Sequence, residues 1–202
     1  MVGVLVVLPL FAAAQNDPDL LRKLATTMAT DQISSDRFEV EVWLLASDQR
    51  LTRYVKNPDK RLFILNTVFD AAHSQTLDPD LVLAVMQVES AFDQFAISKV
   101  GAQGIMQVMP FWRDEIGRPQ DNLTDLVTNV RYGTTILAHY LSVAKGDLVE
   151  ALARYNGSRG RLEYPELVVK AWRTVWRNKS SSDLPDLQES CRSYGLKACR
   201  YQ

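Results

Sequence analysis

Hydrophobic positions recur at helical spacing along most of the chain, and strand-like alternation is scarce. The pattern predicts helices over about residues 17–30, 36–51, 78–92, 124–145, 147–155 and 165–178, with a further helix opening at residue 58. Three helices open with an N-cap residue followed by proline: Asp17-Pro18, Asn57-Pro58 and Asp78-Pro79. Residues 93–119 are broken by glycines and a proline, which predicts a structured loop with one small hairpin and one short helix. The predicted fold class is therefore mostly α.

The length of 202 residues suits one domain with terminal extensions. We predict a main domain over residues 57–178, an N-terminal helical extension over 15–56 and a short C-terminal tail over 179–202. In the helix that opens at residue 58, Leu62, Leu65, Phe69 and Ala72 are predicted to form the buried stripe. The pattern does not decide whether the extension packs on the domain or links it to something else.

The two chain ends indicate an exported, periplasmic protein. Residues 1–14 form an apolar run ending in three alanines, which is typical of a signal peptide. No lysine or arginine precedes the run, so a buried strand or helix start is the alternative. In an exported chain Cys191 and Cys199 could form a disulfide worth about 2 to 3 kcal/mol, the alternative being two unpaired thiols.

Charge and metal-ligand counts exclude several functions. The chain has 23 Lys and Arg against 24 Asp and Glu, so it carries no electrostatic signature of nucleic-acid binding. Two cysteines and two histidines spread along the chain cannot form a zinc cage. We expect no metal, no cofactor and no nucleic-acid partner.

Glu89 is the first candidate for chemistry. On a helix that begins near Asp78, it shares a face with Val82 and Met86, and no basic residue lies between Asp78 and Glu89. Desolvation by this apolar face should raise the pKa of the carboxyl group. An acid still protonated near neutral pH can donate a proton to a glycosidic oxygen. The alternative is a solvated helix-end carboxylate, or a buried one satisfied by Ser90 and nearby amides.

The segment VGAQGIMQVMP, residues 100–110, is the second candidate. Gly101 and Gly104 allow a close approach of the backbone to a ligand or to another segment. Met106 and Gln107 add a soft apolar contact and a hydrogen-bonding amide, which together suit a sugar. Taken singly these signals are weak, because glycine pairs are common and methionine is usually a core residue. An ordinary helical domain without a site is the corresponding alternative.

Four pieces of the chain together resemble the signature of the soluble, lysozyme-like lytic transglycosylases. They are Glu89-Ser90, the segment from Ser98 to Pro110, the segment from Asn129 to Gly133 and the segment from Ala151 to Asn156. The resemblance covers about residues 78–176 and implies a lysozyme-like α fold. It also implies cleavage of the β-1,4 bond between N-acetylmuramic acid and N-acetylglucosamine in peptidoglycan, leaving 1,6-anhydromuramoyl ends. A single glutamate acts first as acid and then as base, so no second carboxylate is required, unlike in most glycosidases.

The resemblance assigns roles residue by residue. Glu89 is the catalytic acid and base; Ser98, Met106, Gln107, Tyr155 and Asn156 bind substrate; Ser90, Gly101 and Gly104 give support. Tyr155 is expected to hydrogen-bond Glu89 or a sugar, with a half-buried core tyrosine as the alternative. Ser90 is equally well explained as a helix-end cap. Asp93 falls where the helix should end, so we interpret it as a loop residue and not as a second acid.

Arg154 stands where the family usually has a small residue. With Arg159 it could meet lactyl or peptide carboxylates of the cell wall, the alternative being solvated surface arginines.

Two other functions remain open from the sequence. One is a lysozyme-type muramidase that hydrolyses the same bond, and the other is a non-catalytic cell-wall-binding module that docks an envelope or secretion apparatus. In each case the expected partner is the peptidoglycan glycan strand, and we expect a monomer.

Overall fold

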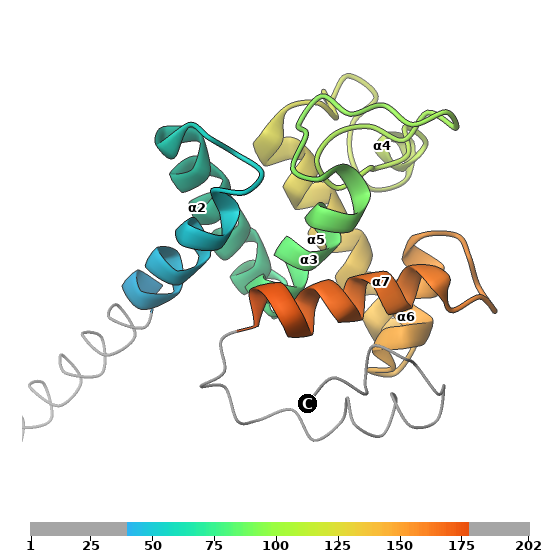
Figure 1. The fold of residues 1–202 in the computed structure, drawn as a ribbon. Coiled ribbons are helices and arrows are strands. Elements are labelled where there is room, and N and C mark those ends of the chain that lie inside the picture. The colour runs from blue at the N-terminus through green and yellow to red at the C-terminus, as the bar shows by residue number, and fades with distance from the viewer. Residues whose placement is uncertain (1–39, 178–202) are drawn as a thin grey trace, which may run out of the picture. The chain divides into compact units, whose positions relative to one another are not determined.

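The structure, a computed structural model, describes residues 40–177 (Figure 1). The predicted signal peptide over 1–14, part of the extension over 15–56 and the tail with Cys191 and Cys199 lie outside the described residues. After a helical segment that ends at residue 51, the elements are α2 (Pro58–Ser74), α3 (Pro79–Ser90), α4 (Trp112–Ile116), α5 (Leu126–Val143), α6 (Leu148–Tyr155), α7 (Glu163–Ala171) and the π-helix η2 (Trp172–Trp176).

Two of the three predicted helix starts with a cap followed by proline are confirmed, while Asp17-Pro18 lies outside the described residues. The side chain of Asn57 accepts a hydrogen bond from the Lys60 amide at 2.9 Å, and that of Asp78 accepts one from the Asp80 amide at 2.8 Å. Helix α3 ends at Ser90, two residues earlier than predicted. It ends there because the next two residues, Ala91 and Phe92, have φ angles of 49° and 67°, which a right-handed helix does not allow.

The loop between α3 and α5 contains the predicted small hairpin and short helix. Gln103 forms isolated antiparallel bridges with Ile97 and Val108, and α4 is the short helix. Across residues 40–177 these bridges are the only β-structure, so the prediction of a mostly α fold is confirmed.

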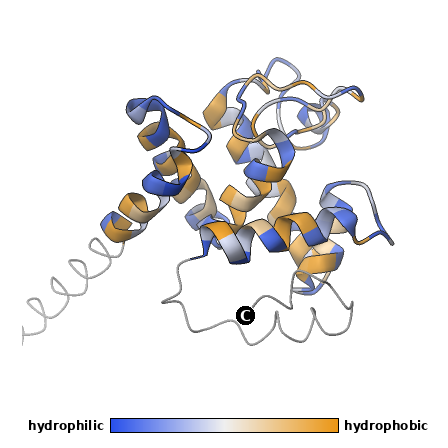
Figure 2. Ribbon diagram, in the orientation of Figure 1, coloured by the Kyte–Doolittle hydropathy of each residue, from blue (hydrophilic) through white to orange (hydrophobic). Residues whose placement is uncertain are grey.

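Helix α3 is the centre of the packing between Trp43 and Arg177. It contacts α2, α7 and η2, while α5 contacts α2 and α6, and α6 contacts α7 (Figure 1). Every residue from Leu81 to Met86 is buried, so α3 is enclosed on all sides for more than a turn. Figure 2 shows the hydropathy of the packed helices. Two tryptophans of η2 hold it in place, because Trp172 Nε1 donates to Asp78 Oδ2 at 3.1 Å and Trp176 Nε1 donates to Gln87 Oε1 at 2.7 Å.

The buried face of α2 departs from the predicted stripe at Leu62, and Phe69 is only partly buried against the core. Leu65 and Ala72 are fully buried as predicted, and Ile64 and Val68 complete the face. Leu62 is 51% exposed, so its prediction was wrong. At 100° per residue, it lies about 100° around the helix from the centre of the face formed by Ile64, Leu65, Val68 and Ala72, so it falls outside the face that α3 and α5 cover.

Within residues 40–177, no helix is both long enough and apolar enough to span a membrane.

Candidate active site

Glu89 lies in the last turn of α3, where the buried part of the helix gives way to the loop. Its carboxyl group is half-buried, and Oε1 accepts a hydrogen bond of 2.6 Å from the hydroxyl group of Tyr164 in α7. Burial raises the pKa of Glu89 to about 7, although the hydrogen bond from Tyr164 acts in the opposite direction. The expected rise in pKa by desolvation is confirmed. At neutral pH this carboxyl group can therefore both donate and accept a proton.

Two buried tyrosine hydroxyls lie close to this carboxyl group. Burial, together with the charge of Glu89, raises the pKa of both Tyr155 and Tyr164 well above the usual range, so both remain hydrogen-bond donors. Tyr155 does not donate to Glu89. Its hydroxyl group donates to the carbonyl oxygen of Met106 at 2.8 Å. The residue that donates to Glu89 is Tyr164. The sequence analysis missed it, because its only signal in the sequence is its position next to Pro165 at the start of a helix.

The turn that follows Gly104 is fixed by side chains from three helices. Ser90 Oγ in α3 donates to the carbonyl oxygen of Ile105 at 2.7 Å, and Asn129 Oδ1 in α5 accepts from the amide of Met106 at 2.8 Å. Tyr155 in α6 adds its bond to the carbonyl oxygen of Met106. The turn at residues 105–106 is therefore held rigidly beside the end of α3, and Ser90 links the helix to the loop through its hydrogen bond.

Two glycines are required by close contacts around this turn. Gly104 has a φ of 79°, and a Cβ there would lie 2.4 Å from both Asn129 Nδ2 and the carbonyl oxygen of Leu123. A Cβ on Gly133 in α5 would lie 2.4 Å from Met106 Sδ. The glycines thus bring the loop and α5 into direct contact.

The other predicted site residues fall into two groups. Ser98, Gln107 and Gly101 are partly exposed in the loop, and Asn156 is exposed just after α6. Ser98 Oγ accepts from the amide of Ala102 at 2.9 Å, so it also shapes the loop. Met106 is fully buried against Gly133, which corrects the expectation that its side chain lines the groove. It is a packing residue behind the turn, because close packing against α5 leaves it no exposed surface.

Three further candidates are placed clearly. Asp93 is exposed, and its Oδ1 accepts from the amide of Phe95 at 2.9 Å, as expected of a loop residue. Arg154 and Arg159 both donate through Nε to Glu150 Oε1, at 2.8 and 2.9 Å. They therefore form an ion-pair cluster on α6 and the loop after it.

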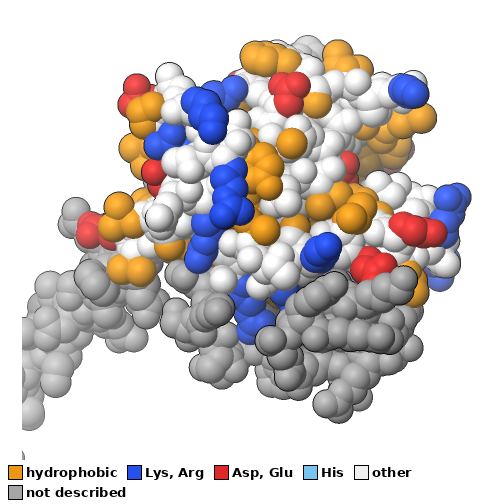
Figure 3. Space-filling view, viewed as in Figure 1, with side chains coloured by type: hydrophobic (Ala, Val, Ile, Leu, Met, Phe, Trp, Pro, Cys, Tyr) orange, Lys and Arg blue, Asp and Glu red, His pale blue; other side chains and the backbone are white. Residues whose placement is uncertain are grey.

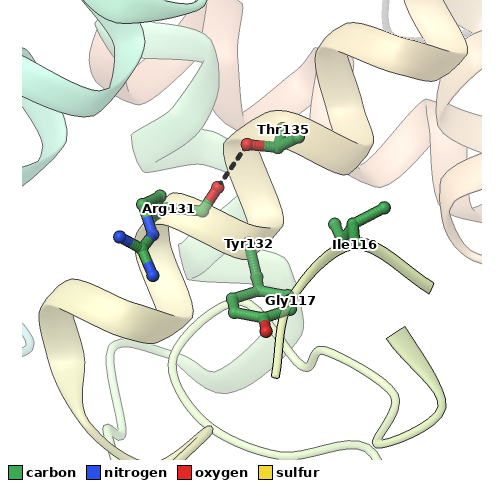
Figure 4. A pocket seen from close by; sticks show the side chains of 5 residues that line it. All are labelled: Ile116, Gly117, Arg131, Tyr132 and Thr135. Carbon is green, nitrogen blue, oxygen red and sulfur yellow. Dashed lines mark hydrogen bonds between the residues drawn. The ribbon is translucent and has the colours of Figure 1, made fainter. Parts of the chain in front are cut away.

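A pocket elsewhere in the fold contains none of the residues around Glu89. Ile116, Gly117, Arg131, Tyr132 and Thr135 line it (Figure 4). Tyr132 donates to Asp121 Oδ2 at 2.7 Å and holds the loop after α4 against α5. The candidate active site is therefore assigned from the position of Glu89 and not from this pocket. Across residues 40–177, no group of three or more His, Cys, Asp or Glu side chains is arranged to hold a metal ion.

The fold is mostly helical, and a half-buried glutamate lies beside a rigid glycine-rich turn. Both features match the class that the sequence motifs resemble, the lysozyme-like lytic transglycosylases. The family described as "Transglycosylase SLT domain" matches residues 66–170, which is more than half of the 202 residues. The chain belongs to this family.

Three known proteins illustrate the similarity. A "Transglycosylase" of Enterobacteria phage PRD1 is 34% identical over 98 residues, covering 48% of this chain and 36% of its own length. A "Membrane-bound lytic murein transglycosylase C" of Sodalis glossinidius (strain morsitans) is 32% identical over 119 residues, covering 50% of this chain and 33% of its own length. An X-ray structure of an inactive mutant of lytic transglycosylase Slt from Pseudomonas aeruginosa has 24% identity and a TM-score of 0.43, covering 55% of this chain and 22% of its own. The chain thus spans about a third of the length of the two curated relatives.

Proposed function

We propose that the protein is a lytic transglycosylase that cleaves the β-1,4 bond between N-acetylmuramic acid and N-acetylglucosamine in peptidoglycan. The observation that carries the proposal is the half-buried carboxyl group of Glu89, with a pKa of about 7, beside the fixed turn. Membership of the transglycosylase family and the names of the relatives support the class of substrate.

Glu89 alone can complete the proton transfers of this reaction. In its protonated form it donates to the glycosidic oxygen of the leaving N-acetylglucosamine while the bond to the muramoyl C1 breaks. The resulting carboxylate then takes the proton of the muramoyl 6-hydroxyl group as that oxygen bonds to C1. The enzyme returns to its protonated form, no water enters the product, and the new end is a 1,6-anhydromuramoyl residue. A pKa near 7 suits both steps, because the group must give and regain one proton.

Tyr164 is positioned to orient the acid. Its hydroxyl group binds Oε1, and within residues 40–177 the carboxyl group has no other hydrogen bond, so Oε2 is free for the reacting oxygens. The bond also favours the carboxylate form, which must exist between the two proton transfers. We therefore assign Tyr164 to the positioning of Glu89 and not to contact with the sugar.

The proposed substrate-binding residues are Ser98, Gln107 and Asn156, which are partly or fully exposed, and Tyr155, whose side chain is partly exposed although its hydroxyl group is buried. Gln107 Nε2 donates to the carbonyl oxygens of Ala96 and Gly104, at 3.1 and 2.9 Å. Its amide oxygen can therefore accept a hydrogen bond from a sugar hydroxyl or acetamido group.

Product analysis tests the proposal. Purified protein is incubated with purified peptidoglycan, and the released fragments are analysed by mass spectrometry. Anhydromuramoyl ends are expected; ends that contain one added water would identify a muramidase. Strands that bind without being cleaved would identify a wall-binding module. Glu89→Gln should stop cleavage and keep binding, while Glu115→Gln, which changes an exposed carboxylate on α4, should keep both.

The proposed location follows from this function, and the monomeric state is a separate proposal. Peptidoglycan lies outside the cytoplasmic membrane, so we propose export by the signal at residues 1–14 and action as a monomer, alone or beside an envelope or secretion apparatus. The N-terminal sequence of the protein recovered from the periplasm tests the export signal, and an N-terminus at Met1 would contradict it.

A further inference from the structure

The loop between α6 and α7 joins two residues of the candidate active site. It covers residues 156–162, with Tyr155 directly before it and Tyr164 two residues after it. Figure 2 shows that this loop is mostly hydrophilic. A side chain on this loop is thus carried by the same short segment that places both tyrosine hydroxyls close to Glu89.

Two arginines of this region share one carboxylate oxygen. Arg154 Nε and Arg159 Nε lie 2.8 and 2.9 Å from Glu150 Oε1. The side chains of Arg154 and Glu150 are each 24% exposed, and that of Arg159 is 69% exposed. Figure 3 shows basic and acidic side chains side by side at the edge of the molecule where this loop lies. Two cations against one anion leave the cluster with a net charge of about +1 at neutral pH.

The guanidinium groups retain donors for a second anion. Both contacts to Glu150 use Nε, and among the described residues neither arginine has a further side-chain partner. Their terminal NH2 groups can therefore bind a planar carboxylate, which guanidinium groups bind through paired hydrogen bonds. Because Glu150 already holds both side chains, a ligand would lose little side-chain entropy on binding.

We propose that Arg154 and Arg159 bind a free carboxylate of the peptide stem on the peptidoglycan strand. This inference rests on the proposed function, since it concerns the substrate of the same site. A peptide stem hangs from the muramoyl residue that reacts at Glu89, and an extended stem advances about 3.5 Å per residue. A stem that runs from this residue toward the loop between Tyr155 and Tyr164 meets a net positive charge that complements its carboxylates.

Two preparations of the same strands test the proposal. In one the stem carboxylates are free, and in the other they are converted to amides, while the glycan and the lactyl linkage remain unchanged. For the wild-type protein we expect kcat/KM to be about tenfold higher with free carboxylates, mainly through a lower KM, as for one good charge-assisted hydrogen bond. Arg159→Gln should bring this ratio close to one and leave cleavage of the amidated strands unchanged, which also shows that the variant is folded.

Arg131→Gln is the matched control. Arg131 is an exposed residue of α5 in the pocket lining of Figure 4, so the change removes the same charge from another place. A wild-type protein that cleaves both preparations equally, or an Arg159→Gln variant that keeps the preference, would overturn the proposal. A loss of preference in Arg131→Gln equal to that in Arg159→Gln would also overturn it, since net charge alone would then explain the effect. If wild type cleaves neither preparation, the proposed function itself fails.

Discussion

Glu89→Gln replaces a carboxyl group that ionises inside the protein by an amide of the same shape that carries no charge. The pKa of this carboxyl is about 7 in the folded protein, against an ordinary value of 4.5. The folded state therefore keeps a proton that the unfolded chain has already lost, and the resulting stabilisation is complete below pH 4.5. It is lost as the pH rises through 7, and the difference amounts to about 3 kcal/mol.

The variant has no such loss, because its amide does not titrate. We expect Glu89→Gln to have nearly the stability of wild type at about pH 4 and to be more stable by about 1 to 3 kcal/mol at about pH 8.5. The amide oxygen can still accept the bond from Tyr164, so the packing should be kept. For a chain of this size, 3 kcal/mol corresponds to a rise in Tm of about 6 to 12 °C.

Urea unfolding of both proteins across this pH range measures the effect. Every other titrating group is common to both, so the difference between their free energies of unfolding isolates Glu89. A difference that does not change with pH would refute the reasoning, because the carboxyl group would then not be desolvated in the folded state. Glu115→Gln serves as the control, since its exposed side chain should give no gain at high pH. Cleavage of peptidoglycan should be absent in Glu89→Gln at every pH.

Three further changes probe the support around the acid. Tyr164→Phe removes a hydrogen bond that lowers the pKa of Glu89, so the alkaline limb of the pH–rate profile should move to higher pH; an unmoved limb would contradict its positioning role. Asn129→Ala leaves the Met106 amide and the Leu123 carbonyl oxygen without their partner, while the Gln103 carbonyl oxygen keeps its bond from the Val108 amide, and should lower the free energy of unfolding by about 2 kcal/mol or more, measured in urea. Gly104→Ala should cost more than 2 kcal/mol, because the added Cβ meets backbone at 2.4 Å. Gly146→Ala should cost only about 1 to 2 kcal/mol, since it shares a positive φ but has open space; equal losses would show that φ alone matters.

The sequence by itself determined the helix starts at Asn57 and Asp78, the mostly α class and the apolar helix face beside Glu89. Each depends on residues within one or two turns of one another, such as Asp78 capping its own helix or Val82 and Met86 lying on the face of Glu89. The direction of the pKa shift could be anticipated as well, because an apolar helix face desolvates a carboxyl group, and burial is the main cause of the raised pKa in the structure.

Only the tertiary structure decided which groups meet at the acid. Tyr164 is 75 residues from Glu89 in the chain, and no local pattern marks a hydroxyl group for so distant a carboxyl group. Tyr155, the residue expected to serve, turns instead to the carbonyl oxygen of Met106, which has to find a partner inside the fold. The full burial of Met106 likewise follows from the contact of its loop with Gly133 on α5. Periodicity identifies which face of a helix is apolar, but the helices that pack against that face select the partners.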